Sequence, residues 1–144
     1  MTQGLVGWYT GVSWTGSQWT DLSSAGNHVT NVSGTITSAT EASATGANYL
    51  NGQPYLYGGT TASLTFPSTI LPYNYTLFSL ARWNGGTTGR IVTAVRAGVT
   101  PNWYSGHQGG KAGVALHSDK EGRLTPYADS HGSKWVLSAD TRFQ

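Results

Sequence analysis

The amino-acid sequence predicts an all-β protein, and three features of its composition indicate this class. Gly, Ser and Thr together exceed a third of the 144 residues, while aromatic residues make up 12% and charged residues only 10%. No segment keeps apolar residues at the i, i+3, i+4, i+7 spacing that an amphipathic helix requires. Thr, Val, Tyr and Trp favour strands, and frequent glycines are typical of the turns between them. The length fits a single domain over residues 1–144.

The first half of the chain contains short strand-like runs separated by turn residues. We expect strands within residues 5–9, 18–22, 28–32, 35–47 and 62–66, and two more around an Asn-Gly turn within residues 49–57. Trp8 and Trp19 lie among apolar neighbours, as does Trp135 near the other end of the chain. We expect these three indoles in the core.

The strongest strand pattern covers residues 75–83, where Phe78 and Leu80 alternate with Leu77 and so would lie on the opposite face from it. An Asn-Gly-Gly turn then leads into residues 89–95, and we expect the two runs to pair as a central hairpin. Further along, the pattern predicts a polar loop over residues 118–133, a strand over 134–138 and the start of another over 141–144.

A glycine-rich segment between these regions predicts a second hairpin, with strands on either side of a Gln-Gly-Gly-Lys turn within residues 101–117. In its first strand, Trp103 and His107 would point to one face and Tyr104 to the other, while His117 ends the second strand. Two aromatic rings and two imidazoles would then lie close together. Such a group would either bind a sugar or form core packing with a polar rim.

Asp21 precedes a Ser-Ser-Ala-Gly turn at residues 23–26. Its carboxylate can accept backbone N–H groups from that turn, as aspartates in turns commonly do. We therefore favour a structural role for Asp21 over a catalytic one.

Charge and cysteine content exclude several classes of protein. Without cysteine, the chain has neither disulfides nor thiolate metal sites. Its eight Lys and Arg residues are spread out and the formal charge is only +2, whereas nucleic-acid binders usually concentrate positive charge. No apolar run approaches the length of a membrane span, and no motif indicates a cofactor. The triplets at Asn31 and Asn74 match the N-glycosylation signal, which also arises by chance in Thr-rich chains.

Two blocks of the sequence resemble laminin-G-like domains of the concanavalin A-like lectin and glucanase superfamily. Residues 19–28 (WTDLSSAGNH) are similar to a W-x-D-x-S-G-x-G-N segment near the start of such domains, with a second serine in place of the first glycine. Residues 102–117 resemble a later hairpin in a branch seen in viruses, phages and marine microbes. With shorter matches at residues 75–78 and 90–92, the resemblance spans about residues 5–138.

The resemblance implies a two-sheet antiparallel jelly roll. Its members include lectins, adhesion domains, coat domains and glycoside hydrolases, so that the fold alone does not choose a function. Such domains normally end with further strands that pair beside the first one, and this sequence lacks them. We therefore expect either a fragment or a strand supplied by another chain.

Catalytic and metal-binding residues of this superfamily are not matched. The glucanase branch carries E-x-D-x-x-E on one strand, whereas the only glutamates here are Glu41 and Glu121, both in loop-like segments. His117, Asp119 and Glu121 would converge only if one strand continued through them, and a calcium site needs six or more oxygens. We expect no enzymatic activity, no metal and a solvated turn at these positions.

Glycan binding is the function that the sequence favours, in a module of an extracellular, virion or cell-surface protein whose partner is a glycan or glycoprotein surface. Aromatic faces stack on sugar C–H groups, while Asn and His bind hydroxyls. The candidate residues are Trp83, Asn102, Trp103, Tyr104, His107 and His117. The competing interpretation of each is core packing.

The alternative is a structural subunit of a filament, fibre or viral coat, assembled by strand sharing between copies at an open sheet edge. Low charge, Gly/Thr/Ser richness and the absence of cysteine suit this interpretation. Glycans on Asn31 and Asn74 would then decorate such an assembly.

Overall fold

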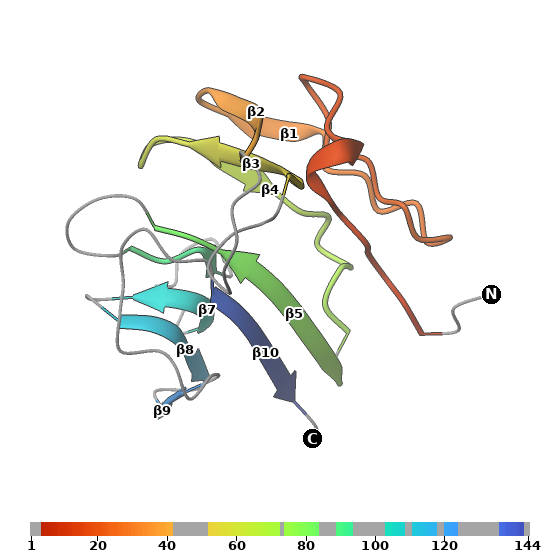
Figure 1. The fold of residues 1–144 in the computed structure, drawn as a ribbon. Coiled ribbons are helices and arrows are strands. Elements are labelled where there is room, and N and C mark those ends of the chain that lie inside the picture. Colours follow the sequence, from red (N-terminus) through yellow and green to blue (C-terminus); the bar gives the residue numbers. More distant parts are fainter. Residues whose placement is uncertain are drawn as a thin grey trace. The chain divides into compact units, whose positions relative to one another are not determined.

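The structure, a computed structural model, is built from β-strands. It describes residues 4–41, 52–72, 74–83, 89–93, 103–108, 111–117, 120–123 and 136–142. These residues form ten strands and one short 3-10 turn, so the predicted all-β class is confirmed. The chain divides into two compact units, Met1–Pro72 and Tyr73–Gln144, which we describe separately (Figure 1). In the described part of the chain, no helix is long and apolar enough to cross a membrane.

The first unit contains two small antiparallel sheets. β1 (Asn31–Ser33) pairs with β4 (Ser63–Thr65), and β2 (Ile36–Thr40) pairs with β3 (Pro54–Gly58). In the first of these sheets Val32 lies directly opposite Leu64, and both are half-buried while their neighbours along each strand are exposed. This alternation of apolar and polar positions explains why short Ser/Thr-rich runs form strands here.

A single 3-10 turn, η1 (Gly11–Ser13), packs against the start of β3. A Cβ atom at Gly11 would lie 2.2 Å from the carbonyl oxygen of Pro54, so that only glycine allows this close approach. The turn fixes the path of the chain between Trp8 and Trp19, two indoles with very different surroundings.

The core of the first unit is an aromatic cluster beside Val29. The ring of Tyr9 lies 5.2 Å from the rings of both Trp19 and Phe66. The indole Nε1 of Trp19 donates to the carbonyl of Thr10 at 2.8 Å, which satisfies the only polar atom of that side chain. Val29 is fully buried and exchanges two backbone hydrogen bonds with Trp19. Trp19 is thus part of the core, as predicted.

Two predictions for the N-terminal segment are wrong. Residues 5–9 form no strand, because the backbone of Trp8 bonds instead to the Asp21 carboxylate and to the N–H of Leu22. Trp8 is 54% exposed rather than part of the core. Trp135, the third indole expected in the core, lies outside the described residues.

The second unit contains a two-stranded and a four-stranded antiparallel sheet. β5 (Tyr75–Ala81) pairs with β10 (Val136–Arg142), while β6 (Val92–Thr93), β7 (Trp103–Gln108), β8 (Lys111–His117) and β9 (Lys120–Arg123) form the larger sheet in that order. β10 also lies close to β7 and β8, so that the two sheets share an interior (Figure 1).

Long-range pairing replaces the predicted central hairpin. β5 pairs along seven residues with β10, whereas β6 pairs with β7. Residues 120–123 form β9 although we predicted a loop there, and residues 141–142 continue β10 rather than starting another strand. The alternating pattern of residues 75–83 identifies a strand correctly, but it carries no information about a partner far away in sequence.

The alternation along β5 is confirmed, and its inner face carries both apolar and polar side chains. Phe78 and Leu80 are 68% and 51% exposed, and Leu137, directly opposite Leu80 on β10, is 62% exposed. On the inner face, Ser138 lies opposite Ser79 and is 1% exposed, while Asp140 is 2% exposed. Large apolar side chains thus lie on both faces of this sheet, with Leu77 half-buried on the inner face and Phe78, Leu80 and Leu137 exposed on the outer one.

Candidate functional site

The predicted glycine hairpin forms as β7 and β8. Its ladder pairs Trp103 with His117 at one end and Gln108 with Lys111 at the other. The register shifts after Gly106, whose φ of 108° suits glycine. A Cβ atom there would also lie 3.0 Å from Ile91, so the irregularity depends on this glycine.

Trp103 faces the shared interior of the second unit. Its Nε1 donates to the hydroxyl of Tyr75 at 2.6 Å, and the two rings meet edge-to-face with centroids 6.2 Å apart. Its carbonyl accepts a hydrogen bond from Thr93 Oγ1 at 3.0 Å. An indole whose only polar atom is engaged in this way connects two sheets and leaves little of its face for a sugar.

Tyr104 is buried, with 3% of its surface exposed. The guanidinium of Arg90 lies 4.9 Å from the centroid of its ring, a cation–π contact that covers one ring face. This burial and the Arg90 contact leave little of the Tyr104 ring for a ligand, so that ligand binding by Tyr104 stays a prediction.

Of the other predicted glycan-binding residues, the structure describes the side chain of Trp83. Trp83 is half-buried, and its ring lies 3.1 Å from the place of a Cβ atom on Gly89. His107 and His117 take part in β7 and β8 through their backbones. Asn102 lies outside the described residues. Among the described residues, the ladder places Trp103 opposite His117.

Asp21 organises the N-terminal loop of the first unit. Its buried carboxylate accepts four hydrogen bonds: Oδ1 from the N–H groups of Trp8 and Ser23, both at 2.8 Å, and Oδ2 from the Ser23 hydroxyl at 2.8 Å and the Asn27 N–H at 2.9 Å. Gly26, with a φ of 71°, turns the chain so that Asn27 can return to the carboxylate. The predicted structural role of Asp21 is confirmed, since about four acceptor positions are all a carboxylate offers.

The same loop shifts the pKa values of two groups. Burial raises the pKa of Asp21, but the hydrogen bonds from Trp8, Ser23 and Asn27 outweigh this effect and hold the pKa below its ordinary value. Burial, and then the negative charge of Asp21, raise the pKa of Tyr9 to about 12. The Tyr9 hydroxyl donates to the carbonyl of Asn27. At neutral pH the carboxylate stays charged and the phenol neutral, which suits a structural role better than acid–base chemistry.

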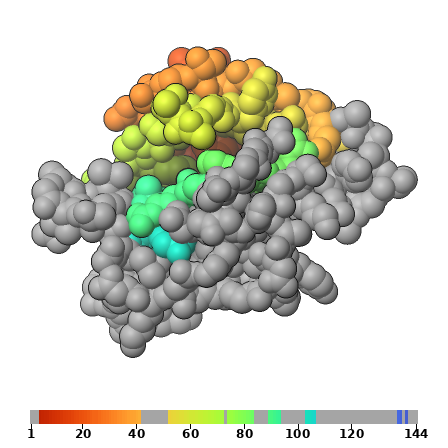
Figure 2. Space-filling view, turned by 90° about the vertical axis from the view of Figure 1, so that its left-hand side faces the viewer, coloured from red at the N-terminus to blue at the C-terminus, as the bar shows by residue number. Residues whose placement is uncertain are grey.

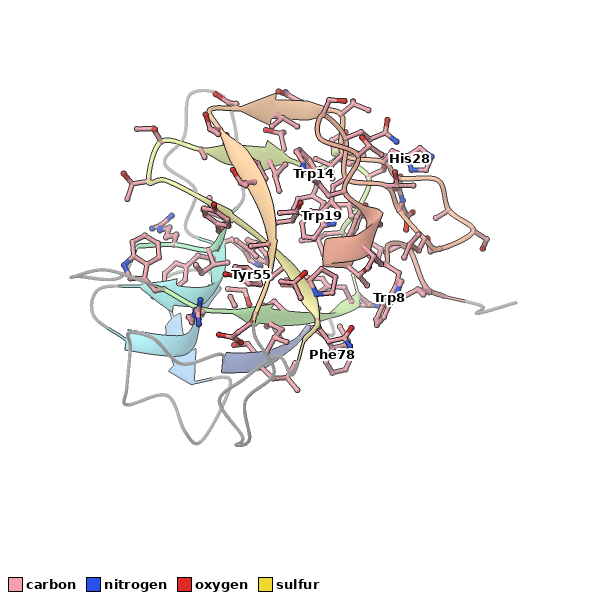
Figure 3. All side chains as sticks on the ribbon, turned by 45° about the horizontal axis from the view of Figure 1, so that its top comes forward. Trp8, Trp14, Trp19, His28, Tyr55 and Phe78 are labelled. Carbon is pink, nitrogen blue, oxygen red and sulfur yellow. The ribbon has the colours of Figure 1, made fainter. Side chains whose placement is uncertain are left out.

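Trp8 presents an exposed indole on a fixed backbone (Figure 3). Its N–H donates to Asp21 Oδ1 at 2.8 Å, and its carbonyl accepts the N–H of Leu22 at 2.8 Å. Leu22 is itself 51% exposed. Because both polar backbone groups of Trp8 are engaged, a ligand would bind its side chain with little further loss of backbone entropy.

A second exposed aromatic residue, Tyr57, lies on β3. Its ring centroid is 6.1 Å from that of Tyr55, two residues earlier on the same face of the strand, and Tyr57 is 54% exposed. Its cross-strand partner on β2 is the exposed Thr37. β2 and β3, orange and yellow in Figure 2, lie side by side at the surface. An aromatic ring next to a hydroxyl is an arrangement that can contact a sugar.

Sequence reasoning missed Trp8 and Tyr57 for different reasons. The apolar neighbours of Trp8 predicted a strand in the core, because the side-chain hydrogen bond that replaces strand pairing is formed with a distant aspartate. For Tyr57 a signal was present, since two tyrosines at i and i+2 must share a strand face.

The structure places few metal-binding side chains together. Within the described ranges, no group of three or more His, Cys, Asp or Glu residues could hold a metal ion. β8 ends at His117, and β9 begins at Lys120, which pairs with His117. A single strand carrying His117, Asp119 and Glu121 on one face is therefore not formed, and Asp119 lies outside the described residues.

Both glycosylation triplets lie at accessible positions. Asn31 is exposed at the start of β1, and Asn74 is exposed immediately before β5. Their glycosylation stays a prediction.

Comparison with known proteins finds no matching family model, no matching curated protein and no matching solved structure. The resemblance to laminin-G-like domains therefore stays a prediction that rests on residues 19–28 and on the β7–β8 hairpin.

Proposed function

We propose that this protein is a non-enzymatic carbohydrate-binding or adhesion module of an extracellular, virion or cell-surface protein. The observation that carries the proposal is the exposed indole of Trp8, whose backbone is held by Asp21 and Leu22. The flat face of an indole can stack on the C–H face of a sugar ring. A side chain on a fixed backbone loses less entropy when the sugar binds.

A second position on the first unit supports the same function. Tyr57 offers another exposed ring, and Thr37 beside it offers a hydroxyl that can donate or accept a hydrogen bond. Trp103 and Tyr104 are engaged by Tyr75 and Arg90. We therefore assign sugar stacking to Trp8 and Tyr57 instead of the hairpin.

We further propose that the strands belong to a concanavalin A-like jelly roll. Support comes from residues 19–28, whose W-x-D motif closes a loop around Asp21, and from the antiparallel pairing of every strand pair in the described residues. An experimental structure without two facing antiparallel sheets would contradict this part of the proposal.

A glycan array followed by titration of the bound sugar tests the function. We expect Trp8→Ala to weaken binding by about tenfold or more while leaving the melting temperature nearly unchanged, because an exposed ring stabilises the fold little. Trp19→Ala is the matched control: it removes the same residue type from the aromatic cluster, and we expect it to cost about 3 kcal/mol of stability. The proposal fails if no sugar binds, or if Trp8→Ala binds as well as the unmodified protein.

The outer face of β5 and β10 favours a second candidate function, a structural subunit of a filament, fibre or coat. Phe78, Leu80 and Leu137 are 68%, 51% and 62% exposed on adjacent strands. Exposed apolar patches of this kind often mark sites of protein association. Ordered oligomers in size analysis and electron microscopy, together with no sugar binding, would support the structural role. A well-folded and strictly monomeric protein would contradict it.

A further inference from the structure

The charges of this protein are divided unequally between its two units. Residues 1–72 contain no lysine or arginine, and their only acidic residues are Asp21 and Glu41, which give a formal charge of −2. Residues 73–144 contain all eight basic residues and the other four acidic ones, which give +4. The two values add to the formal charge of +2 of the whole chain.

The first unit also carries the exposed rings of Trp8 and Tyr57, and it contains few charges of its own. Asp21 is buried and its carboxylate already accepts four hydrogen bonds, which leaves little for a ligand. Glu41, which follows β2, is the other acidic residue of this unit and supplies no positive charge for an anionic ligand. No cationic Lys or Arg side chain of this unit can pair with an anionic sugar, since its sequence contains none.

Neutral hydrogen-bonding groups, in contrast, are plentiful on this unit. Asn31 lies opposite Thr65 and Ser33 lies opposite Ser63, and all four are exposed on one face of the β1–β4 pair. Hydroxyl and amide groups both donate and accept hydrogen bonds, which matches the hydroxyl groups of a sugar.

We propose that the ligand of the first unit is a neutral, hydroxyl-rich glycan, without carboxylate, sulfate or phosphate groups. This inference rests on the function proposed above and narrows it to one chemical class. Stacking on Trp8 and hydrogen bonds with neutral side chains supply the binding. Binding of this kind depends little on ionic strength, because no ion pair has to form.

Matched polymers test the inference with the full chain: one neutral glucan, and the carboxymethylated and sulfated derivatives of the same glucan. We expect the neutral form to bind and both anionic forms to bind at least about tenfold more weakly. Affinity for the neutral form should change by less than about twofold as sodium chloride rises from about 0.1 to about 1 M, where the Debye length falls from about 10 to about 3 Å. Trp8→Ala should remove this binding.

The outcomes separate the inference from the proposed function. Stronger binding of an anionic form, lost at high salt and retained in Trp8→Ala, overturns the inference while leaving a carbohydrate-binding protein whose site lies among the basic residues of the second unit. If neither this neutral glucan nor other neutral polymers such as mannan, galactan and xylan bind, and the anionic forms also fail, the proposed function itself is wrong.

Discussion

At the scale of single residues, Asp21 shows how one carboxylate can replace a strand pairing. It joins the backbone of its own turn, at Ser23 and Asn27, to that of Trp8, thirteen residues earlier. Four hydrogen bonds to a charged acceptor exceed what one neutral ladder position could contribute. The bond from the Trp8 N–H holds the Trp8 backbone where its indole is exposed. Asp21, a structural residue, therefore positions Trp8, the proposed binding residue.

Asp21→Asn should reveal this dependence. The amide Nδ2 cannot accept the hydrogen bonds that reach Oδ2, so we expect a loss of about 2–3 kcal/mol of stability at neutral pH. In the unmodified protein the pKa of Asp21 is held below its ordinary value. Its contribution is therefore full above about pH 4, the value in an unfolded chain, and is lost as the pH falls through the lower folded value. Urea unfolding across the acid range measures this loss, which the variant should largely lack.

Tyr9→Phe should reveal the opposite linkage in alkali. The pKa of Tyr9 is raised to about 12, whereas an unfolded tyrosine ionises near 10. The neutral phenol thus contributes fully below about pH 10, and its contribution is lost as the pH rises from there toward 12. The variant should be about 1 kcal/mol less stable at neutral pH, because its hydrogen bond to Asn27 is missing, and its stability should fall less between these two pH values. Equal alkaline unfolding curves for both proteins would contradict the assigned pKa.

At the scale of elements, the sequence predicts strands better than their partners. The alternation along β5 and the glycine turn between β7 and β8 are local signals, and both elements form as predicted. The pairing of β5 with β10 depends on residues from opposite ends of the second unit, which no local pattern records. A similar limit applies to the candidate site. The sequence left both sugar binding and core packing open for Trp103, and its hydrogen bond to Tyr75 is a long-range contact that no local pattern records.

Leu77 and Leu80 on β5 form a matched pair that tests which face of this strand is buried. Leu77 lies on the inner face and is half-buried, whereas Leu80 lies on the outer face and is 51% exposed. We expect Leu77→Ala to cost about 2 kcal/mol of stability, and Leu80→Ala to change it by less than about 0.5 kcal/mol. Thermal unfolding at low protein concentration measures both.

The Leu77→Ala and Leu80→Ala variants also test whether copies of the chain associate through the outer face of β5 and β10. If the outer face joins copies of the chain, Leu80→Ala should lower the apparent mass in size-exclusion chromatography, and Leu77→Ala should not change it while the protein stays folded. A large loss of stability in Leu80→Ala with unchanged mass would instead place Leu80 within a core.

At the scale of the whole molecule, few of the described apolar side chains are fully buried in either unit. Among the described residues, Val29 in the first unit and Tyr104 in the second are the buried apolar side chains. Two-stranded sheets are marginally stable in isolation, and units of about 70 residues bury a smaller fraction of their surface than larger domains do. The prediction that residues 1–144 form a single domain can therefore be tested by asking whether the two units unfold together.

Chemical unfolding of the full chain distinguishes one domain from two. If the chain is one cooperative domain, tryptophan fluorescence and far-ultraviolet circular dichroism should give one coincident transition. Trp19→Ala in the first unit and Leu77→Ala in the second should then each move that whole transition, although the altered residues belong to different units. Independent domains would give a different result, with each substitution moving only one of two resolvable steps. The expected outcome is the single transition, because units of about 70 residues are small for independent folding.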